Sequence, residues 1–367
     1  MRRATLLLVG CLLLVAMPLV AEAEVLVYHG EQTLYADTVW DGEVLIDGIL
    51  TVAPGVTLEI RPGSRVRFTR LDTNGDGVGE HEIFSQGTVL AIGTEQQPIL
   101  FTSAEATPRR GDWGALNMMV SEQDNRLVHC RVEYAYRGFH AHFSKASLSA
   151  VEFRYNLRGA QFQESQVVID SCRFIDNSNG LQFRNSRVEL SHSLVSGSHW
   201  GVRCVYSDVV MRNCTISDNL INGFNMRDGS LLAHGNRIVG NRRGLYLQRS
   251  RGDIGHNRLA DNSEHGIFLE DSTVELAMNL ISANGRSGVR WLNSEGRIAG
   301  NRISDNGVYA LINDGTTSVS ARNNWWGTDD VDLIGLAVRD GQDRPGAGSV
   351  DVRYPLARPL SGPYRLE

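Results

Sequence analysis

Residues 235–269 contain the same short unit twice, in the text GNRIVGNRRGLYLQRSRGDIGHNRLADNSEHGIFL. Each copy begins with asparagine, arginine and an apolar residue, at Asn236 and at Asn257. Each copy ends with a glycine followed by apolar, variable and apolar residues, at Gly244 and at Gly266. Self-similarity at such a short period is typical of repeat architectures, so the period of the unit indicates the fold.

The glycine unit recurs through most of the chain at intervals of 21 or 22 residues. Its glycines are Gly138, Gly159, Gly180, Gly201, Gly223, Gly244, Gly266 and Gly288. The short runs between them alternate apolar with polar residues and are bounded by Asn, Asp, Gly and Ser, which is typical of strands joined by tight turns. Such strands pair most simply with the same strand one coil later, about 4.8 Å away. The sequence therefore predicts an all-β, single-stranded, right-handed parallel β-helix.

Stacking at one period places residues of equal phase in ladders. The first predicted inward ladder is Phe139, Ala160, Leu181, Val202, Phe224, Leu245, Ile267 and Val289. The second is Phe162, Phe183, Cys204, Met226, Leu247, Leu269 and Trp291. A third, at a corner, is Asn236, Asn257, Asn279, Asn301 and Asn323. Stacked amides satisfy turn backbone groups and one another, so we interpret these asparagines as structural.

Three cysteines have the same corner phase in every second coil. Cys130, Cys172 and Cys214 are spaced 42 residues apart. Alternate coils lie about 9.6 Å apart, which exceeds the Cα separation of about 7 Å that a disulfide spans. We predict buried free thiols.

The N-terminus has the pattern of an export signal. Arg2 and Arg3 precede an apolar run, and Ala21-Glu22-Ala23 forms a small-residue cleavage site, so residues 1–23 are predicted to be removed. An alternative is a lipoprotein box that ends at Cys11, whose side chain would then be acylated. Beyond the signal we expect a β-rich N-terminal cap with the first coils at 24–99, the β-helix at 100–327 and a C-terminal cap or extended tail at 328–367. The protein is predicted to be exported, to the periplasm or the cell exterior.

Composition excludes some partners. The net charge of −6 provides no basic excess of the kind that neutralises nucleic-acid phosphates, so nucleic acid is not expected as a partner. No apolar run after the signal reaches the roughly 18 residues that span a bilayer, so no transmembrane segment is predicted in the mature chain.

The repeats resemble those of the pectin-lyase-like superfamily, in its exported right-handed parallel β-helix proteins. The pattern at 235–247 is similar to repeats of the carbohydrate-binding and sugar-hydrolase group and to NosD-like repeats. The resemblance covers roughly residues 100–327 and implies the fold rather than an activity. The paired-aspartate, Trp-Ile-Asp-His and Asp-Pro-His-Asp motifs that mark enzymes of this superfamily do not occur in this sequence.

A calcium loop is the sharpest local motif. Residues 72–80 read DTNGDGVGE, with oxygen donors at alternate positions and glycine at positions four, six and eight. The twelfth position is Ile83 rather than the bidentate glutamate of such loops. The predicted Ca²⁺ ligands are Asp72, Asn74, Asp76, Val78, Glu80 and Glu82. The expected role is structural, and the alternative is a solvated acidic turn.

An outward-facing row is the candidate binding surface. Residues between the two inward ladders are expected to face solvent: Gln161, Gln182, Arg203, Asn225, Tyr246, Phe268 and Arg290. Amides and guanidinium groups offer planar hydrogen bonds to sugar hydroxyls, and aromatic rings stack on sugar rings. The arginines favour a carboxylated or sulfated polymer. The alternative is that this row is an ordinary polar solenoid face.

Catalysis has one candidate constellation, at equivalent positions of three consecutive coils: Asp228, Arg249 and Asp271. Two carboxylates about 9.6 Å apart fall near the range of inverting glycosidases, but an intervening arginine favours an ion-pair ladder instead. The leading prediction is an exported protein that binds an extended, acidic polysaccharide along one face without turnover. The alternatives are a polysaccharide lyase or glycoside hydrolase with a non-standard site, and a NosD-like accessory protein of the cell envelope.

Overall fold

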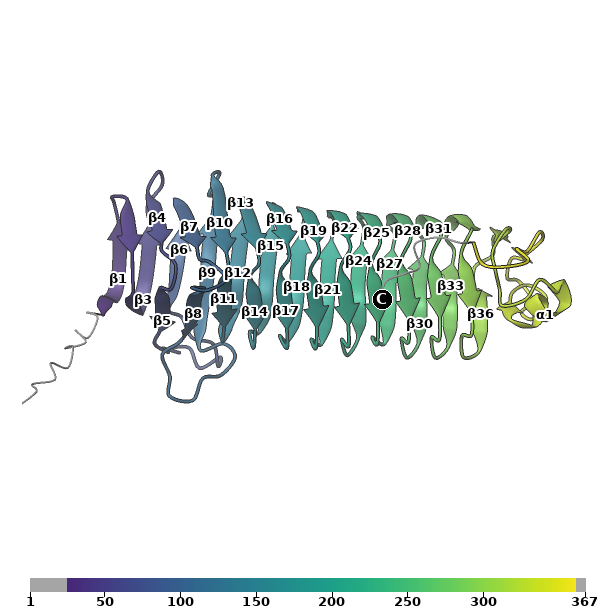
Figure 1. Ribbon diagram of the computed structural model, residues 1–367, viewed down its shortest axis with the longest axis horizontal. Coiled ribbons are helices and arrows are strands. Elements are labelled where there is room, and N and C mark those ends of the chain that lie inside the picture. Colours follow the sequence, from purple (N-terminus) through teal and green to yellow (C-terminus); the bar gives the residue numbers. More distant parts are fainter. Residues whose placement is uncertain (1–24, 361–367) are drawn as a thin grey trace, which may run out of the picture.

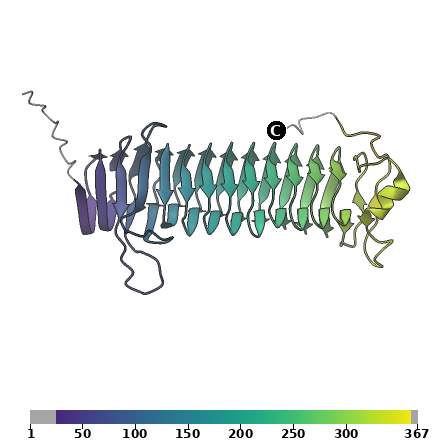
Figure 2. The same ribbon diagram turned by 60° about the horizontal axis from the view of Figure 1, so that its bottom comes forward.

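The computed structural model describes residues 25–360 as one right-handed parallel β-solenoid of about 13 turns, stacked along a single axis (Figure 1). This confirms the predicted fold. The signal segment and the lipoprotein alternative at Cys11 lie outside the described residues. Each turn has three strands, and each strand pairs in parallel with its equivalent one coil later. The strands therefore form three rows along the axis, which the turned view separates (Figure 2).

The first row carries the glycine unit and has the longest repeated strands. It comprises β6 (Glu82–Ser85), β9 (Trp113–Met119), β12 (Ala135–His142), β15 (Arg158–Gln163), β18 (Asn179–Arg184), β21 (Trp200–Val205), β24 (Asn222–Arg227), β27 (Arg243–Gln248), β30 (His265–Glu270), β33 (Ser287–Leu292), β36 (Tyr309–Asn313) and β38 (Val338–Arg339). Its outer surface carries the predicted row of outward residues.

The second row precedes the first in each coil and is made mostly of three-residue strands. It comprises β5 (Arg65–Phe68), β8 (Ile99–Ser103), β11 (Cys130–Glu133), β14 (Glu152–Arg154), β17 (Arg173–Ile175), β20 (Leu194–Ser196), β23 (Thr215–Ser217), β26 (Arg237–Val239), β29 (Arg258–Ala260), β32 (Leu280–Ser282) and β35 (Arg302–Ser304). At the N-terminal end β3 (Glu43–Val52) pairs with β5 through its first half and with β6 through its second half. The first two rows thus diverge from one strand.

The third row forms a separate sheet of 14 strands. It comprises β2 (Thr38–Trp40), β4 (Thr57–Ile60), β7 (Thr88–Ile92), β10 (Asp124–Val128), β13 (Lys145–Ser149), β16 (Gln166–Asp170), β19 (Arg187–Ser191), β22 (Asp208–Arg212), β25 (Ser230–His234), β28 (Arg251–Gly255), β31 (Thr273–Ala277), β34 (Glu295–Ala299), β37 (Val319–Ser320) and β39 (Val350–Asp351). Alternate side chains of all three rows fill one continuous core.

The repeated glycines are required by close packing between coils. A Cβ at Gly159 would lie 2.5 Å from the carbonyl oxygen of Gly180, and a Cβ at Gly180 would lie 2.6 Å from that of Gly201. Real Cβ atoms do not approach backbone oxygens so closely, so any side chain here would push the coils apart. Glycine therefore recurs because the first row approaches its neighbour at this point.

The corners explain the polar residues of the repeat. Each regular coil turns at three corners, and a single residue with positive φ occupies each turn, such as Tyr206, Asn213 and Asp218. The residue after it points inward and stacks on its equivalent in the next coil. Three ladders result, of which the repeat pattern predicted only one.

The predicted asparagine ladder is confirmed for Asn236 to Asn301. Asn257 Oδ1 accepts hydrogen bonds from Asn236 N and Nδ2, both at 2.9 Å, and the pattern repeats in the following coils. The prediction of Asn323 as the last member was wrong. Asn324 Oδ1 accepts the hydrogen bonds from Asn301 N and Nδ2, because the last interval is 23 residues. Asn323 instead occupies the turn, with φ of 59°. A second ladder comprises Asn156, Asn177, Ser198, Asn219, Asn241, Asn262, Asn284 and Asn306.

The cysteine prediction is confirmed within the described residues. Cys130, Cys172, Cys204 and Cys214 are buried free thiols. Cys214 lies directly beneath the asparagine ladder, because its backbone N–H donates to Asn236 Oδ1 at 2.9 Å. Burial raises the pKa of the Cys214 thiol to about 11, so this thiol is inert at neutral pH.

The two ends of the stack differ from its middle. At the N-terminal end β1 (Leu26–Leu34) pairs with β3 alone among the described strands and is mainly exposed. Two longer connections, residues 69–81 and 104–112, leave the stack nearby (Figures 1 and 2). At the C-terminal end residues 328–360 add β38 to the first row and β39 to the third. Apart from these two short strands, the segment consists of turns and irregular chain and the short helix α1 (Val331–Leu336), which Asp330 caps.

Candidate functional site

The seven predicted outward residues form one line across consecutive first-row strands. Gln161 pairs with Gln182 and Gln182 with Arg203, and Asn225, Tyr246, Phe268 and Arg290 continue the same register. Their exposure differs. Arg203 is exposed, whereas Gln161 and Phe268 are each only 6% exposed because neighbouring side chains cover them.

Aromatic rings and guanidinium groups stack against one another at two places on this face. The rings of Tyr246 and Phe268 stack with centroids 4.8 Å apart, and the Arg290 guanidinium lies 4.6 Å from the Phe268 centroid. In an earlier coil Arg203 lies 5.4 Å from the ring of Trp200. Stacking of this kind orients the guanidinium groups while leaving their N–H donors available.

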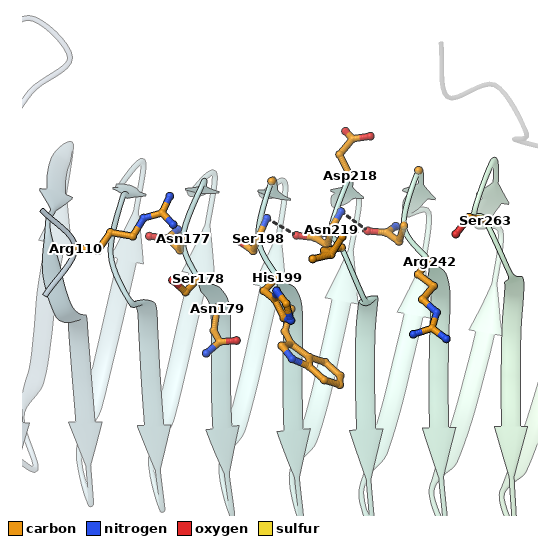
Figure 3. Close-up of a pocket in the computed structure, with 15 residues that line it drawn as sticks. Arg110, Asn177, Ser178, Asn179, Ser198, His199, Asp218, Asn219, Arg242 and Ser263 are labelled. Atoms are coloured by element: carbon orange, nitrogen blue, oxygen red, sulfur yellow. Dashed lines mark hydrogen bonds between the residues drawn. The ribbon is translucent and has the colours of Figure 1, made fainter. Parts of the chain in front are cut away.

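A groove runs beside this face, over the corner between the second and first rows. Its volume is about 840 Å³ and it crosses five consecutive coils. Its floor is the second asparagine ladder, where Asn219 Oδ1 accepts from Ser198 N at 3.1 Å (Figure 3). Because the ladder amides are already paired, the groove presents the side chains on its walls to a ligand. Those side chains include Arg110, His199, Trp200, Asp218 and Arg242.

One wall of the groove comes from outside the regular repeat. Arg110 lies on the connection 104–112 and donates through Nη2 to the carbonyl oxygen of Asp176 at 2.7 Å. On the opposite side, Arg242 and Arg243 both pair with Glu264, at 2.8 and 2.7 Å. Sequence reasoning missed Arg110 and Arg242, since neither lies within the short glycine unit.

A buried polar cluster closes the N-terminal end of the face. Asn117 donates to Glu82 through Nδ2 at 3.3 Å, and its Oδ1 lies 2.8 Å from His140 Nδ1. Burial raises the pKa of Glu82 to about 7, and burial together with Arg137 lowers the pKa of His140 to about 3. His140 Nε2 is buried without a partner among the described residues.

The sequence matches two protein-family models. A family model described as "Right handed beta helix region" matches residues 112–255, 162–294 and 243–343, which together cover more than half of the chain. The chain belongs to the right-handed β-helix family. A second model, "Pectate-lyase like beta helix domain", matches residues 31–166 of this β-helix protein.

Similar solved structures have low sequence identity to this chain. The periplasmic alginate epimerase AlgG is 15% identical, with 90% of this chain and 76% of that chain covered and a TM-score of 0.45. The Azotobacter vinelandii mannuronan C-5 epimerase AlgE4 A-module is 17% identical, with 84% and 90% covered and a TM-score of 0.37. The Dettilon tailspike protein is 12% identical, with 84% and 62% covered and a TM-score of 0.36. No curated protein matches the sequence of this β-helix protein.

The candidate catalytic trio of this β-helix protein lies in a recurrent turn. Asp228, Arg249 and Asp271 have φ of 56°, 46° and 49°, and equivalent turn positions elsewhere hold Val120 and Phe143. Arg249 binds both carboxylate oxygens of Asp228, at 2.7 and 3.0 Å, and this hydrogen bonding lowers the pKa of Asp228. A carboxyl group held ionised in this way is a poor general acid.

The predicted calcium loop folds on its own side chains. Asp72 accepts hydrogen bonds from the backbone N–H groups of Gly75 and Gly77 and from Arg70 Nη2. Asn74 and Asp76 each accept from a backbone N–H two residues later. Within residues 25–360 no three His, Cys, Asp or Glu side chains gather as a metal-holding group. Calcium binding stays a prediction.

Glu82 does not join this loop. It lies on β6 and faces Asn117, at the closed end of the first-row face. Glu80 turns back instead and accepts from the Thr73 backbone N–H at 3.1 Å. Among the described residues no helix is long and apolar enough to cross a membrane.

Proposed function

We propose that this protein is exported and binds an extended, acidic polysaccharide along the outer surface of the first row and its adjoining groove, without turnover. The observation that carries the proposal is an excess of arginine over acidic side chains, together with the partly exposed rings of Trp200 and Tyr246, on one continuous surface of a chain whose net charge is −6. Guanidinium groups pair with carboxylates or sulfates, and aromatic rings stack on sugar faces.

The contrast with the third row supports this choice of surface. A depression of about 540 Å³ on the third row is lined by Arg187 and Arg251 together with Asp208, Asp253 and Glu275. Its charges therefore nearly cancel. The groove beside the first row is lined by Arg110 and Arg242 against Asp218, with Glu264 paired to Arg242, and the face next to it adds Arg203, which has no ion pair among the described residues.

Retardation of the purified protein in gels that contain polygalacturonate, alginate or a neutral glucan tests the binding. We expect retardation by the acidic polymers that weakens as salt is raised, because exposed charge pairs are screened. The variant Arg203→Gln is expected to weaken retardation, whereas Arg187→Gln on the third row is the matched control. Equal retardation by the neutral and acidic polymers would refute an acidic ligand.

The second candidate function is cleavage of the bound polymer, as a lyase or hydrolase. The observation in its favour is Glu82, a carboxyl group at one end of the face whose pKa burial raises into the neutral range, as general acids and bases require. Incubation with the same polymers, with absorbance of unsaturated product and reducing ends as readouts, decides between the two. Turnover that Glu82→Gln abolishes would establish cleavage, and absence of turnover with retention of binding supports the first proposal. Neither binding nor turnover would favour an envelope protein with a protein partner.

A further inference from the structure

A second cavity lies at the C-terminal end of the first-row face. Its volume is about 330 Å³. It is lined by His265, Arg286, Arg290, Ile312, Asp314, Arg339 and Arg344. Four guanidinium groups therefore surround one carboxylate, which gives the cavity a strong positive excess.

The single carboxylate is already engaged. Asp314 accepts from Arg290 Nε at 2.9 Å and from Arg344 Nη1 at 3.0 Å, and its side chain is only 8% exposed. It therefore fixes two of the arginines, one through each of its carboxylate oxygens. Within residues 25–360, the side chains of Arg286 and Arg339 have no ion pair or side-chain hydrogen bond. Two guanidinium groups thus face the cavity with unused donors.

The remaining titratable group in the wall of the cavity, His265, is uncharged at neutral pH. His265 is almost fully buried, and its Nδ1 lies 2.7 Å from Ser287 Oγ. Burial, together with Arg290, lowers the pKa of His265 to about 4, so the ring is neutral at neutral pH. The nearest glutamate in the preceding coil, Glu264, is paired with Arg242 and Arg243. Glu264 forms no ion pair with Arg286 in the described part of the chain.

The walls of this cavity come from the last repeats and from the C-terminal segment that follows them. Arg286 and Arg290 belong to the repeat that contains β33, whereas Arg339 lies on β38 and Arg344 follows it in the C-terminal segment. The pairing of β38 with β36 and the contact of Arg344 with Asp314 hold this segment against the repeats. The C-terminal segment is therefore held where Arg339 and Arg344 lie beside the arginines of the last repeats.

We propose that this cavity is an anion subsite that binds the carboxylate or sulfate group of one sugar unit of the polymer. The inference rests on the proposed function, and it adds the chemical group recognised and its position at the C-terminal end of the face. Arginine donates two parallel N–H groups, which match the paired oxygens of a carboxylate or a sulfate ester. Arg286 and Arg339 would hold the anion, with Arg290 and Arg344 positioned beside it by Asp314.

Calorimetric titration with glucuronic acid, glucose 6-sulfate and glucose tests this subsite in the full chain. We expect the wild type to bind one or both anionic sugars and not glucose. The double variant Arg286→Gln/Arg339→Gln is expected to weaken that binding by about tenfold or more, since it removes the two unpaired guanidinium groups. The control Arg187→Gln/Arg251→Gln removes the same charge from the third-row depression and is expected to bind as the wild type does.

The polymer assay separates failure of this inference from failure of the proposed function. If the double variant is retarded by acidic polymers and binds the anionic sugars as tightly as the wild type, the subsite is refuted while the binding face stands. Equal weakening in the control pair would also refute it, because the effect would then follow net charge alone. If the wild type binds neither the sugars nor the polymers, both proposals fail. The variant Arg286→Lys is expected to recover only part of the affinity, because lysine retains the charge without the planar fork.

Discussion

The two ends of the first-row face are built in opposite ways. At the N-terminal end, Glu82, Asn117 and His140 are linked by hydrogen bonds, with Asn117 and His140 buried and Glu82 partly buried. At the C-terminal end, Arg286 and Arg339 face an open cavity without partners among the described residues. Polar groups that are paired and buried contribute to the folded state, whereas unpaired charges at a surface remain available to a ligand.

Because of this difference, substitutions at the two ends are expected to affect different properties, folding stability at one end and ligand binding at the other. Substitutions at the closed end are expected to change stability in a pH-dependent manner, because burial shifts the pKa values of Glu82 and His140 in opposite directions. Substitutions at the open end are expected to change ligand binding with little effect on stability. Each end therefore serves as the control for the other.

The largest expected effect is at His140. Its pKa is lowered from 6.5 to about 3, so the unfolded chain takes up a proton below pH 6.5 while the folded chain does not, and stability is lost as pH falls from 6.5 toward 3. The variant His140→Gln has no imidazole to protonate, so it is expected not to lose stability in this way. Glutamine fits the site because the next coil already has a glutamine, Gln161, at the equivalent position. The free energy of unfolding of the variant minus that of the wild type is expected to be more favourable at pH 4 than at pH 7, by up to about 3 kcal/mol.

Urea denaturation at pH 4 and pH 7 measures this gain. The exposed His199 provides the matched control, and His199→Gln is expected to show no comparable difference between the two pH values. An unchanged pH profile in the His140 variant would mean that the ring is accessible to protons in the folded state. The closed end would then be open, and the contrast between the two ends would fail.

A smaller effect is expected from calcium at the loop beside the closed end. The loop reaches the first-row region through the Gly79 backbone N–H, which donates to the Gly111 carbonyl oxygen at 2.6 Å. A site with millimolar to submillimolar affinity would stabilise the folded chain by about 1 kcal/mol at millimolar calcium. Thermal melting with calcium and with chelator measures this shift, and Asp76→Asn is expected to abolish it. Identical melting temperatures in both conditions would leave the solvated turn as the correct interpretation.

The middle of the solenoid could be predicted from the sequence because each position is repeated. The inward ladders, the glycine phase and the buried thiols follow from one period, and Asp176-Asn177, Asp218-Asn219 and Asp261-Asn262 carried the signal of the second asparagine ladder as well. Two details were wrong: the ladder ends one residue later, where the interval lengthens to 23 residues, and Gln161 and Phe268 of the outward row are buried by their neighbours.

The two ends could not be predicted in this way. Glu82 resembled a calcium ligand because it follows an acidic loop, but the pairing of β6 with β3 places it against Asn117. Arg339 and Arg344 lie after the last recognisable repeat, so no periodicity indicates that they meet Arg286 and Arg290. Contacts between the repeat and non-repeating segments depend on tertiary packing, which a period does not encode.

The smallest expected effect is the change in folding stability when an unpaired arginine of the open end is substituted in the absence of ligand. Arg286 is exposed and has no side-chain partner among the described residues, so Arg286→Gln is expected to change the free energy of unfolding by no more than about 0.5 kcal/mol. Removal of one of several like charges around the cavity relieves repulsion, which favours a slight gain. Asp314→Asn is the informative contrast, since it takes the carboxylate from Arg290 and Arg344 and is expected to destabilise the fold by at least about 1 kcal/mol. Chemical denaturation of both variants at low salt measures the two changes. A loss of more than about 1 kcal/mol in Arg286→Gln would show that this arginine already has a structural partner, and the cavity would then lack the free donors on which anion binding depends.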